Sequence, residues 1–220
     1  MRPFFVSGIG TGIGKTVVSA LLCETLQADY WKPVQAGFAE GTDSETVRSL
    51  VTNPQTFIHP ETYRLQLPAS PHIAAREENT RIEFSRIKKH FASMNTGRPL
   101  IIEGAGGLLV PLNESEMIAD LVSLLDARLI LVSRNYLGSI NHSLLTAEVC
   151  RQRQLEVSGW VFNDQFMDYE GEIVSWTGIP AICSVPFMPR QTREGISMEA
   201  KRIGDRVRNR LLPATDHPRE

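Results

Sequence analysis

The 220-residue chain has few cysteines, no long apolar run and almost no excess of charge. Its three cysteines, Cys23, Cys150 and Cys183, lie far apart without a C-x-x-C spacing. That pattern excludes a disulfide framework and is typical of a reduced, intracellular protein. No apolar run approaches the roughly eighteen residues of a membrane span, and the opening MRPFFVSG is too short for a secretory signal. We therefore expect a cytoplasmic protein with no membrane partner.

The charge balance also argues against nucleic acid as a partner. The net charge is −2, and the 22% charged and 42% hydrophobic fractions are those of an ordinary globular protein. Nucleic-acid binding needs a basic face, of which the composition gives no sign. A chain of this length can bury enough core to fold without disulfides or a structural metal.

Short apolar runs alternate with segments of helical periodicity, which predicts a parallel sheet covered by helices on both faces. Strands are expected at about residues 3–7, 30–32, 99–103, 128–133, 157–163 and 181–185. Helices are expected near residues 15–26, 85–95, 117–125, 141–153 and 198–211. The stretch 38–79 has several prolines and weak periodicity, so we expect a long irregular and functional excursion there. One domain is expected over residues 1–220, with a frayed tail from about 212.

The strongest local signal is the glycine-rich run Gly8-Ile-Gly-Thr-Gly-Ile-Gly14-Lys15-Thr16. It follows the apolar Phe4-Phe5-Val6 and precedes an expected helix, which is the context of a phosphate-binding loop. Backbone amides of such a loop, with the positive end of the helix, bind phosphate oxygens. Lys15 would reach the β- and γ-phosphates, and Thr16 would place its hydroxyl on Mg²⁺. The run has one residue more than the standard spacing, and a flexible glycine turn with a solvated Lys15 is the alternative interpretation.

Two carboxylates are candidates for holding the metal. Glu103 ends the apolar run Leu100-Ile-Ile-Glu103, before four small residues that leave room for a ligand. Open α/β sheets bind ligands at the carboxyl ends of their strands. Asp43 is the second candidate, although Asp also caps helices and a loop could satisfy Glu103. Lys32, at the end of the second expected strand, would add positive charge near the phosphate loop.

Taken together, these segments resemble the dethiobiotin synthetase family over roughly Phe4 to Pro186. Each piece alone is weak, but the ordered set is specific. In the family's order the pieces are the loop ending Gly14-Lys15-Thr16, Lys32-Pro-Val with Gly37, the Asp43 segment, Ser70-Pro-His72, Glu103-Gly-Ala-Gly-Gly with Pro111-Leu112, Leu137-Gly-Ser-Ile-Asn141-His142 with Leu145-Thr146, Gly159-Trp-Val with Asn163-Asp164, and Val185-Pro186.

The resemblance implies an α/β, P-loop NTPase-like three-layer fold with a mostly parallel central sheet and helices on both faces. It implies a ligase of biotin biosynthesis that uses ATP and Mg²⁺ to close the ureido ring of dethiobiotin from 7,8-diaminononanoate and CO₂. The reaction would pass through a carbamate and a carbamic-phosphoric anhydride and release ADP and phosphate. In the family the carboxylate end of the substrate approaches the subunit interface, which implies a homodimer.

The resemblance also implies roles for the residues at matching positions. Lys15 and Lys32 would be catalytic. Metal would be held by Thr16, Asp43 and Glu103. The nucleotide would be bound by Gly12, Ile13, Gly14, Lys15, Thr16, Val17, Asp43, Glu103, Gly104, Ala105, Gly106, Asn163, Asp164, Val185, Pro186 and Phe187. The substrate would be bound by Thr11, Lys32, Gly138, Ser139, Ile140 and Asn141, the last four at a helix start that favours a carboxylate.

The sequence departs from the family's pattern at positions around the loop and the second strand. Ala36 stands where many members carry a hydroxyl near the substrate, which removes a hydrogen bond from that side chain. Gly10 and Gly12 replace acidic residues found in some members, which leaves less shielding of the nucleotide. None of these changes removes a residue that the chemistry requires.

The alternative interpretation is a P-loop ATPase switch of the partitioning or septum-positioning type. Those proteins carry an extra lysine early in the loop, and the stretch from Gly8 to Gly12 has none. A GTP-binding module is disfavoured because no Asn-Lys-x-Asp string occurs. An amidotransferase-type synthase would need a glutaminase domain for which 220 residues leave no room. ATP turnover that depends on a diamine would separate the enzyme from the switch.

Overall fold

A computed structural model describes residues 1–94, 97–164 and 167–212, and its centre is a seven-stranded sheet of order β4-β2-β6-β1-β7-β8-β9. Each neighbouring pair in this sheet is parallel. Its strands are β1 (Phe4–Gly8), β2 (Asp29–Trp31), β4 (Ile58–His59), β6 (Leu100–Glu103), β7 (Arg128–Arg134), β8 (Val157–Asn163) and β9 (Ala181–Val185). A separate small parallel sheet pairs β3 (Val34–Ala36) with β5 (Tyr63–Leu65).

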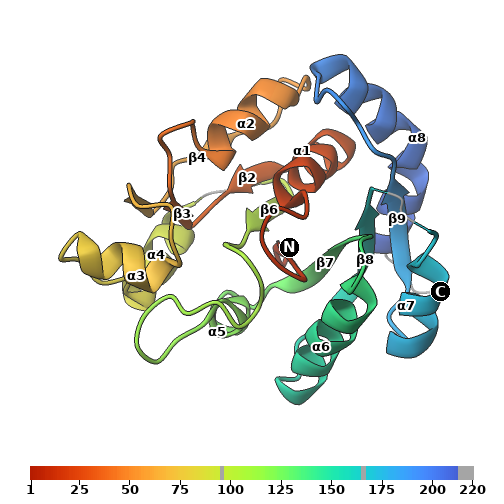
Figure 1. Ribbon diagram of the computed structural model, residues 1–220. Coiled ribbons are helices and arrows are strands. Elements are labelled where there is room, and N and C mark those ends of the chain that lie inside the picture. Colours follow the sequence, from red (N-terminus) through yellow and green to blue (C-terminus); the bar gives the residue numbers. More distant parts are fainter. Residues whose placement is uncertain (95–96, 165–166, 213–220) are drawn as a thin grey trace, which may run out of the picture.

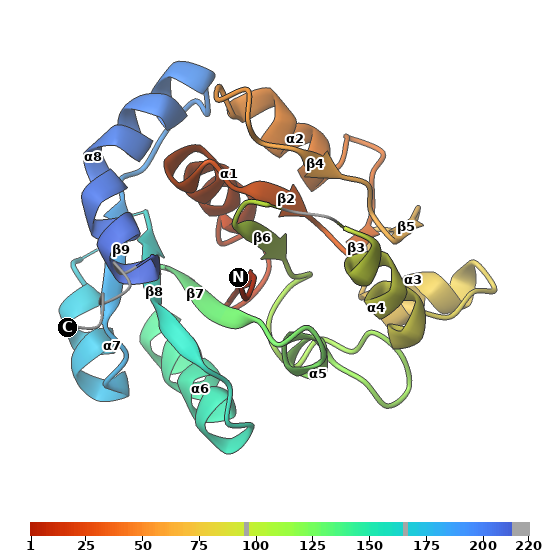
Figure 2. The same cartoon turned by 180° about the vertical axis from the view of Figure 1, so that it is seen from behind.

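Helices cover both faces of the central sheet, which gives three layers (Figures 1 and 2). One face carries α1 (Lys15–Leu26), α2 (Asp43–Leu50) and α8 (Arg193–Leu211). The other side carries α3 (Pro71–Glu77), α4 (Phe84–Ser93), α5 (Ile118–Leu124), α6 (Ser139–Gln152) and α7 (Glu170–Thr177). None of the described helices combines the length and the apolar character needed to cross a membrane. The predicted three-layer α/β fold is confirmed.

Alternation along the strands explains why the sheet is buried on both faces. Successive side chains of a strand point to opposite sides, so Phe4 and Val6 of β1 belong to the core beneath α1 while Phe5 belongs to the opposite core. In β2, Tyr30 joins the α1 core and Trp31 joins the other. Continuous apolar runs without polar alternation are what such a doubly covered parallel sheet requires.

The six expected strands are all present, with boundaries shifted by a residue or two. The expectation of an irregular excursion over 38–79 was wrong, because that stretch contains α2, β4, β5 and α3. Helix α8 begins at Arg193, ahead of the expected 198, because Thr192 caps it by accepting a hydrogen bond from the Gly195 amide. The small sheet and α7 were not predicted. The frayed tail falls mostly on residues 213–220, outside the described residues, as does the expected helix end at 95.

The strand order sets the position of the site. Strand β1 lies in the middle of the sheet, between β6 and β7, and Val6 of β1 is in register with Glu103 of β6. The chain leaves β1 through α1 to β2 on one side, while β7 and β8 extend the sheet on the other. Ligands bind at such a reversal of strand order, outside the carboxyl ends of the strands.

Candidate active site

The phosphate loop, residues 9–14, joins β1 to α1 and ends at Gly14, which caps α1 in a left-handed conformation with φ of 88°. A Cβ atom at Gly14 would lie 1.9 Å from Nδ2 of Asn163, so both backbone and space require glycine here. That Nδ2 donates a hydrogen bond to the carbonyl oxygen of Ile13 at 2.8 Å. This hydrogen bond connects the end of β8 directly to the phosphate loop.

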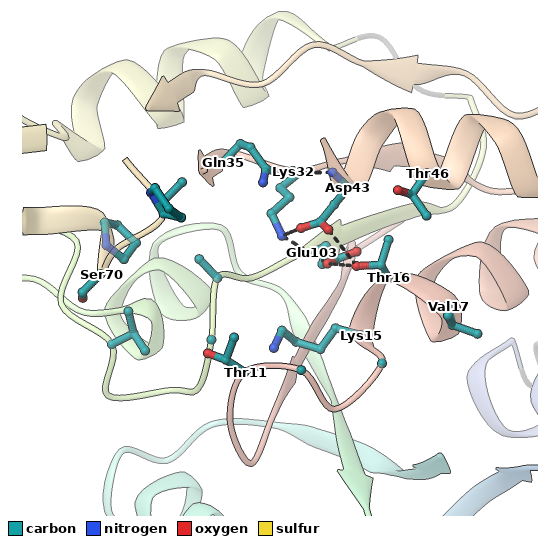
Figure 3. A pocket seen from close by; sticks show the side chains of 18 of the residues that line it. Thr11, Lys15, Thr16, Val17, Lys32, Gln35, Asp43, Thr46, Ser70 and Glu103 are labelled. Atoms are coloured by element: carbon teal, nitrogen blue, oxygen red, sulfur yellow. Dashed lines mark hydrogen bonds and ion pairs between the residues drawn. The ribbon is translucent and has the colours of Figure 1, made fainter. Parts of the chain in front are cut away.

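The Lys15 side chain runs back along the loop, and its Nζ donates to the carbonyl oxygen of Gly10 at 2.7 Å. Figure 3 shows it in the same pocket as the other polar side chains of the site. Burial lowers the pKa of Lys15 to about 8, and the nearby Glu103 acts in the opposite direction. A phosphate group bound to the loop would give this ammonium a charged partner in place of a neutral carbonyl.

Four side chains from distant parts of the chain meet in a carboxylate cluster, which we define as Thr16, Lys32, Asp43 and Glu103 (Figure 3). Thr16 Oγ1 lies 3.0 Å from Asp43 Oδ1 and 2.9 Å from Glu103 Oε1. The Lys32 ammonium forms ion pairs with Asp43 Oδ2 and with Glu103 Oε1, the latter at 3.1 Å. The structure thus brings together all three side chains predicted to hold metal and Lys32, one of the two lysines predicted to be catalytic.

Local structure fixes the direction of Asp43. It is the first residue of α2, directly after Thr42, which forms a capping box with Glu45. The box satisfies two free amides of the helix end. The Asp43 amide donates to Gln35 Oε1 at 3.2 Å, and Gln35 belongs to the small sheet. The 38–79 stretch is therefore an ordered support for the cluster.

Lys32 and Asp43 of the cluster favour each other's charged forms. Burial acts to lower the pKa of Lys32, but Glu103 and Asp43 outweigh it and raise that pKa above its ordinary value. Burial acts to raise the pKa of Asp43, but the Lys32 charge and hydrogen bonds from Lys32 and Thr16 hold it below its ordinary value. Burial, and then the negative charge of Glu103, raise the pKa of Tyr30 well above its ordinary value, so its phenol stays protonated.

The donor set of the cluster fits Mg²⁺. Among the described residues, no group of three or more His, Cys, Asp or Glu side chains is placed to hold a metal ion by itself. Mg²⁺ in nucleotide sites instead uses one or two carboxylates together with phosphate oxygens and waters. Asp43, Glu103 and the Thr16 hydroxyl supply such a set of oxygens beside the phosphate loop.

Two neighbouring hollows lie along the phosphate loop. The larger, the main cleft, has a volume of about 770 Å³ and contains Lys15 and the whole carboxylate cluster. The smaller, which we call the base hollow, has a volume of about 130 Å³ and lies at the ends of β7 and β8. The two share the lining residues Gly12, Gly14, Val17 and Gln191, so the phosphate loop lies between them.

Most of the predicted site residues line these hollows. The main cleft is lined by the predicted Thr11, Gly12, Gly14, Lys15, Thr16, Val17, Lys32, Asp43, Glu103, Ala105 and Gly106. The base hollow is lined by the predicted Asn163, Asp164 and Phe187. Neither hollow includes Ile13, Gly104, Val185, Pro186 or the four residues Gly138 to Asn141 among its lining residues. Gly138 caps α6 and the next three residues begin it, and none of the four lines the main cleft of the same chain.

Sequence reasoning missed several lining residues. Gln35, Thr46 and Ser70 line the main cleft, and Ser70 belongs to a motif that the sequence did present. Arg134 lines the base hollow and forms an ion pair with Asp164, 3.0 Å between Nη2 and Oδ2. Arg134 is the last residue of β7, as Glu103 is of β6, so both lie at the carboxyl ends of the parallel strands. A charged residue at the end of an expected strand is the sequence feature by which Arg134 could have been predicted.

We expect Glu103→Gln to weaken the use of Mg²⁺, so that the Mg²⁺ concentration needed for half-maximal ATP turnover rises at least about tenfold. We also expect it to lower turnover more than Asp43→Asn does. Glu103 is 1% exposed and accepts hydrogen bonds on both oxygens, whereas the Asp43 side chain is 31% exposed. The partly exposed Asp43 carboxylate can be replaced by water, whereas water cannot reach the buried position of Glu103. Magnesium titrations of both variants measure the difference, and equal or reversed effects would contradict this ranking.

We expect Asn163→Ala to reduce the preference for ATP over GTP. Because Nδ2 already donates to Ile13, Oδ1 remains to accept from an exocyclic amino group, which adenine has and guanine lacks at the matching position. The measurement is the ratio of kcat/KM for ATP to kcat/KM for GTP, because loss of the hydrogen bond to Ile13 should affect both nucleotides alike. An unchanged ratio would place base recognition elsewhere.

Comparisons with known proteins identify the family to which the chain is similar. The family model described as an AAA domain matches residues 2–195. The chain is 46% identical over 206 residues to the ATP-dependent dethiobiotin synthetase BioD of Cytophaga hutchinsonii, covering 93% of this chain and 98% of that one. It is 44% identical over 194 residues to the enzyme of the same name from Agrobacterium fabrum, covering 88% and 90% of the two chains.

Solved structures support the fold. The MinC:MinD cell division protein complex of Aquifex aeolicus matches with a TM-score of 0.65 at 12% identity, covering 100% of this chain and 99% of that one. A ParA family ATPase from Chlorobium tepidum matches with a TM-score of 0.57 at 14% identity, covering 98% and 95%. At such low identity these matches speak for the P-loop fold alone, whereas the sequence relatives speak for the family. The chain belongs to the AAA domain family and, within it, to the ATP-dependent dethiobiotin synthetases.

Proposed function

We propose that this chain closes the ureido ring of dethiobiotin from 7,8-diaminononanoate and CO₂, with ATP as co-substrate and Mg²⁺ as cofactor. The observation that carries the proposal is the meeting of Lys15 with the carboxylate cluster in one cleft of about 770 Å³. That volume accommodates a triphosphate with a second, small substrate beside it. The names of the sequence relatives support the proposal, because they give dethiobiotin as the product and ATP as a requirement.

The chemistry suits a site made of charges without a covalent nucleophile. One amine of the substrate adds to CO₂, loses a proton and becomes a carbamate. A carbamate oxygen attacks the γ-phosphorus and ADP leaves, then the second amine attacks the carbamoyl carbon and phosphate leaves. These steps need positioning and neutralisation of negative charge more than protein nucleophiles. Mg²⁺, when bound, supplies part of that neutralisation at the phosphate oxygens.

The residues divide these tasks according to position. Lys15 and the loop amides at the start of α1 would bind the β- and γ-phosphates. Lys32, which enters the cleft from the end of β2, would stabilise charge on the carbamate. Thr16, Asp43 and Glu103 would hold Mg²⁺. Asn163 and the base hollow would receive adenine.

We further propose a homodimer in which α6 of each chain faces the substrate of the other. A third hollow of about 320 Å³ adjoins the main cleft at Thr11 and Val110 and continues to α6. Around it Leu109 and Leu145 are 50% and 57% exposed, and Leu137, just before α6, is 87% exposed. A second copy would cover these side chains and bring a helix start to the substrate carboxylate.

We propose that the described chain works as one domain, because both cores share the central sheet.

The test is phosphate release measured with ATP, 7,8-diaminononanoate and bicarbonate, and then with each component omitted. We expect release to require all three and dethiobiotin to appear in equal amount. ATP hydrolysis at the same rate with and without the diamine would instead favour a switch ATPase.

Sedimentation of the wild-type protein and of the Leu145→Asp variant tests the dimer, which the substitution should dissociate.

A further inference from the structure

The two oxygens of the Glu103 carboxylate have separate partners. Oε1 faces the main cleft, where Thr16 Oγ1 lies at 2.9 Å and Lys32 Nζ at 3.1 Å. Oε2 accepts a hydrogen bond from the hydroxyl of Tyr30 at 2.9 Å. Since Glu103 is 1% exposed, each of these contacts replaces water that the carboxylate has lost.

The position of Tyr30 follows from strand register. Tyr30 of β2 is in register with Ile101 of β6, so Glu103 is its diagonal neighbour on the same face of the sheet. Aromatic side chains reach across that diagonal distance. Tyr30 is completely buried beneath α1, and its ring packs in that core while its hydroxyl reaches the Glu103 carboxylate at the end of β6.

We propose that Tyr30 is a positioning residue for the metal site, which holds the Glu103 carboxylate in the rotation that presents Oε1 to Mg²⁺. This proposal rests on the proposed use of Mg²⁺ with ATP. With Oε2 bound to the phenol, Oε1 alone is left for the metal, beside the Thr16 hydroxyl. Without the phenol, the carboxylate is free to turn both oxygens toward the Lys32 ammonium, which competes with the metal for them.

Tyr30→Phe removes only the hydroxyl from a filled position, and Tyr63→Phe is its matched control. Tyr63 is also buried, at 5% exposed, and its hydroxyl accepts a hydrogen bond from the Glu83 amide, outside the residues that line the main cleft. We expect Tyr30→Phe to raise the Mn²⁺ dissociation constant of the ADP complex about tenfold or more, as loss of a partner that orients a metal ligand does. Tyr63→Phe should leave it unchanged, and metal-free ADP binding should be equal in all three proteins.

Electron paramagnetic resonance of Mn²⁺ gives these constants without turnover. In a Glu103→Gln background, Tyr30→Phe should change the constant much less, because the carboxylate that it orients is gone. The positioning role would be overturned if Tyr30→Phe changed the Mn²⁺ dissociation constant no more than Tyr63→Phe does. It would also be overturned if Tyr30→Phe changed that constant as much in the Glu103→Gln background as in the wild-type protein. If wild-type protein with ADP binds no Mn²⁺, the metal site itself is wrong and this inference fails with it. If Mn²⁺ binds but no dethiobiotin forms, only the proposed reaction fails.

A second measurement needs no substitution of Tyr30, should the phenylalanine variant fold poorly. Because the phenol donates to the carboxylate that the metal would bind, adding Mg²⁺ to the wild-type ADP complex should shift the ultraviolet absorption of a buried tyrosine. The shift should be absent in Glu103→Gln and retained in Tyr63→Phe. A shift retained in Glu103→Gln would contradict the proposal.

Discussion

Lys32→Ala is expected to lower kcat for ring closure by about two to three orders of magnitude, while the ATP dissociation constant changes far less. The Lys32 ammonium lies in the main cleft, charged and paired with the two carboxylates of the cluster. In the proposed reaction a cation there would stabilise charge that develops as the carbamate oxygen attacks phosphorus, so its effect would be largest in the transition state. Steady-state kinetics at saturating substrates and calorimetric titration with ATP separate the two quantities.

Controls are needed because the Lys32 side chain is only 5% exposed and its loss leaves Asp43 and Glu103 without their cation. Thermal unfolding with and without Mg²⁺ shows how much of the effect is loss of fold. Lys88→Ala, on the exposed side of α4, removes the same charge and should change neither quantity. Lys32→Arg should also be impaired, since a planar fork cannot replace a compact ammonium between two carboxylates. Loss of ATP binding with retained kcat would move Lys32 to the nucleotide site.

Lys15→Ala is expected to lower kcat/KM for ATP by on the order of a thousandfold and to leave the fold intact. The Lys15 ammonium is the cation of the phosphate loop, and its protein hydrogen bond goes to the Gly10 carbonyl of the same loop. Its loss would therefore remove the proposed phosphate contact without taking a hydrogen-bond partner from a buried carboxylate. Circular dichroism and ATP turnover test the two parts of the expectation.

Thr16→Ala should cripple turnover as well, through the metal rather than the phosphates, and Thr16→Ser should restore most of it because the hydroxyl returns. Saturating Mg²⁺ should partly compensate Thr16→Ala and should not compensate Lys15→Ala. Near-normal rates for both alanine variants at saturating Mg²⁺ would contradict the phosphate-loop assignment.

The elements that the sequence predicted are those whose pattern is local. The six predicted strands of the central sheet lie in largely apolar runs that contribute to the cores on both faces, and α1 follows a glycine-rich loop of the kind that binds phosphate. The stretch over 38–79 could not be predicted in the same way. Its strands are two or three residues long, too short for any periodicity, and they form only because β3 and β5 pair with each other and β4 pairs with β2.

The same distinction holds in the candidate site. Lys15, Thr16 and Glu103 stand in motifs with a recognisable order, so their convergence could be expected. The contacts that orient them could not, because they depend on register and on side-chain direction. Tyr30 reaches Glu103 only because β2 and β6 pair with Tyr30 opposite Ile101, which no local pattern specifies. Likewise Gln35 meets the Asp43 amide through the small sheet.

Under the proposed function, in which Asn163 and the base hollow receive adenine, the contact between Gly14 and Asn163 would limit how this protein can change its choice of nucleotide. The Asn163 amide fills the space that any side chain at position 14 would need. A larger residue at 163 would press on the backbone that holds the phosphates, so selection for a new base at this position would damage catalysis before it improved recognition. Arg134 and Phe187 border the same hollow and are partly or largely exposed, 44% for the Arg134 side chain and 62% for Phe187. Altered base specificity is therefore expected to evolve first at those two positions, with Gly14 and Asn163 changing only as a pair.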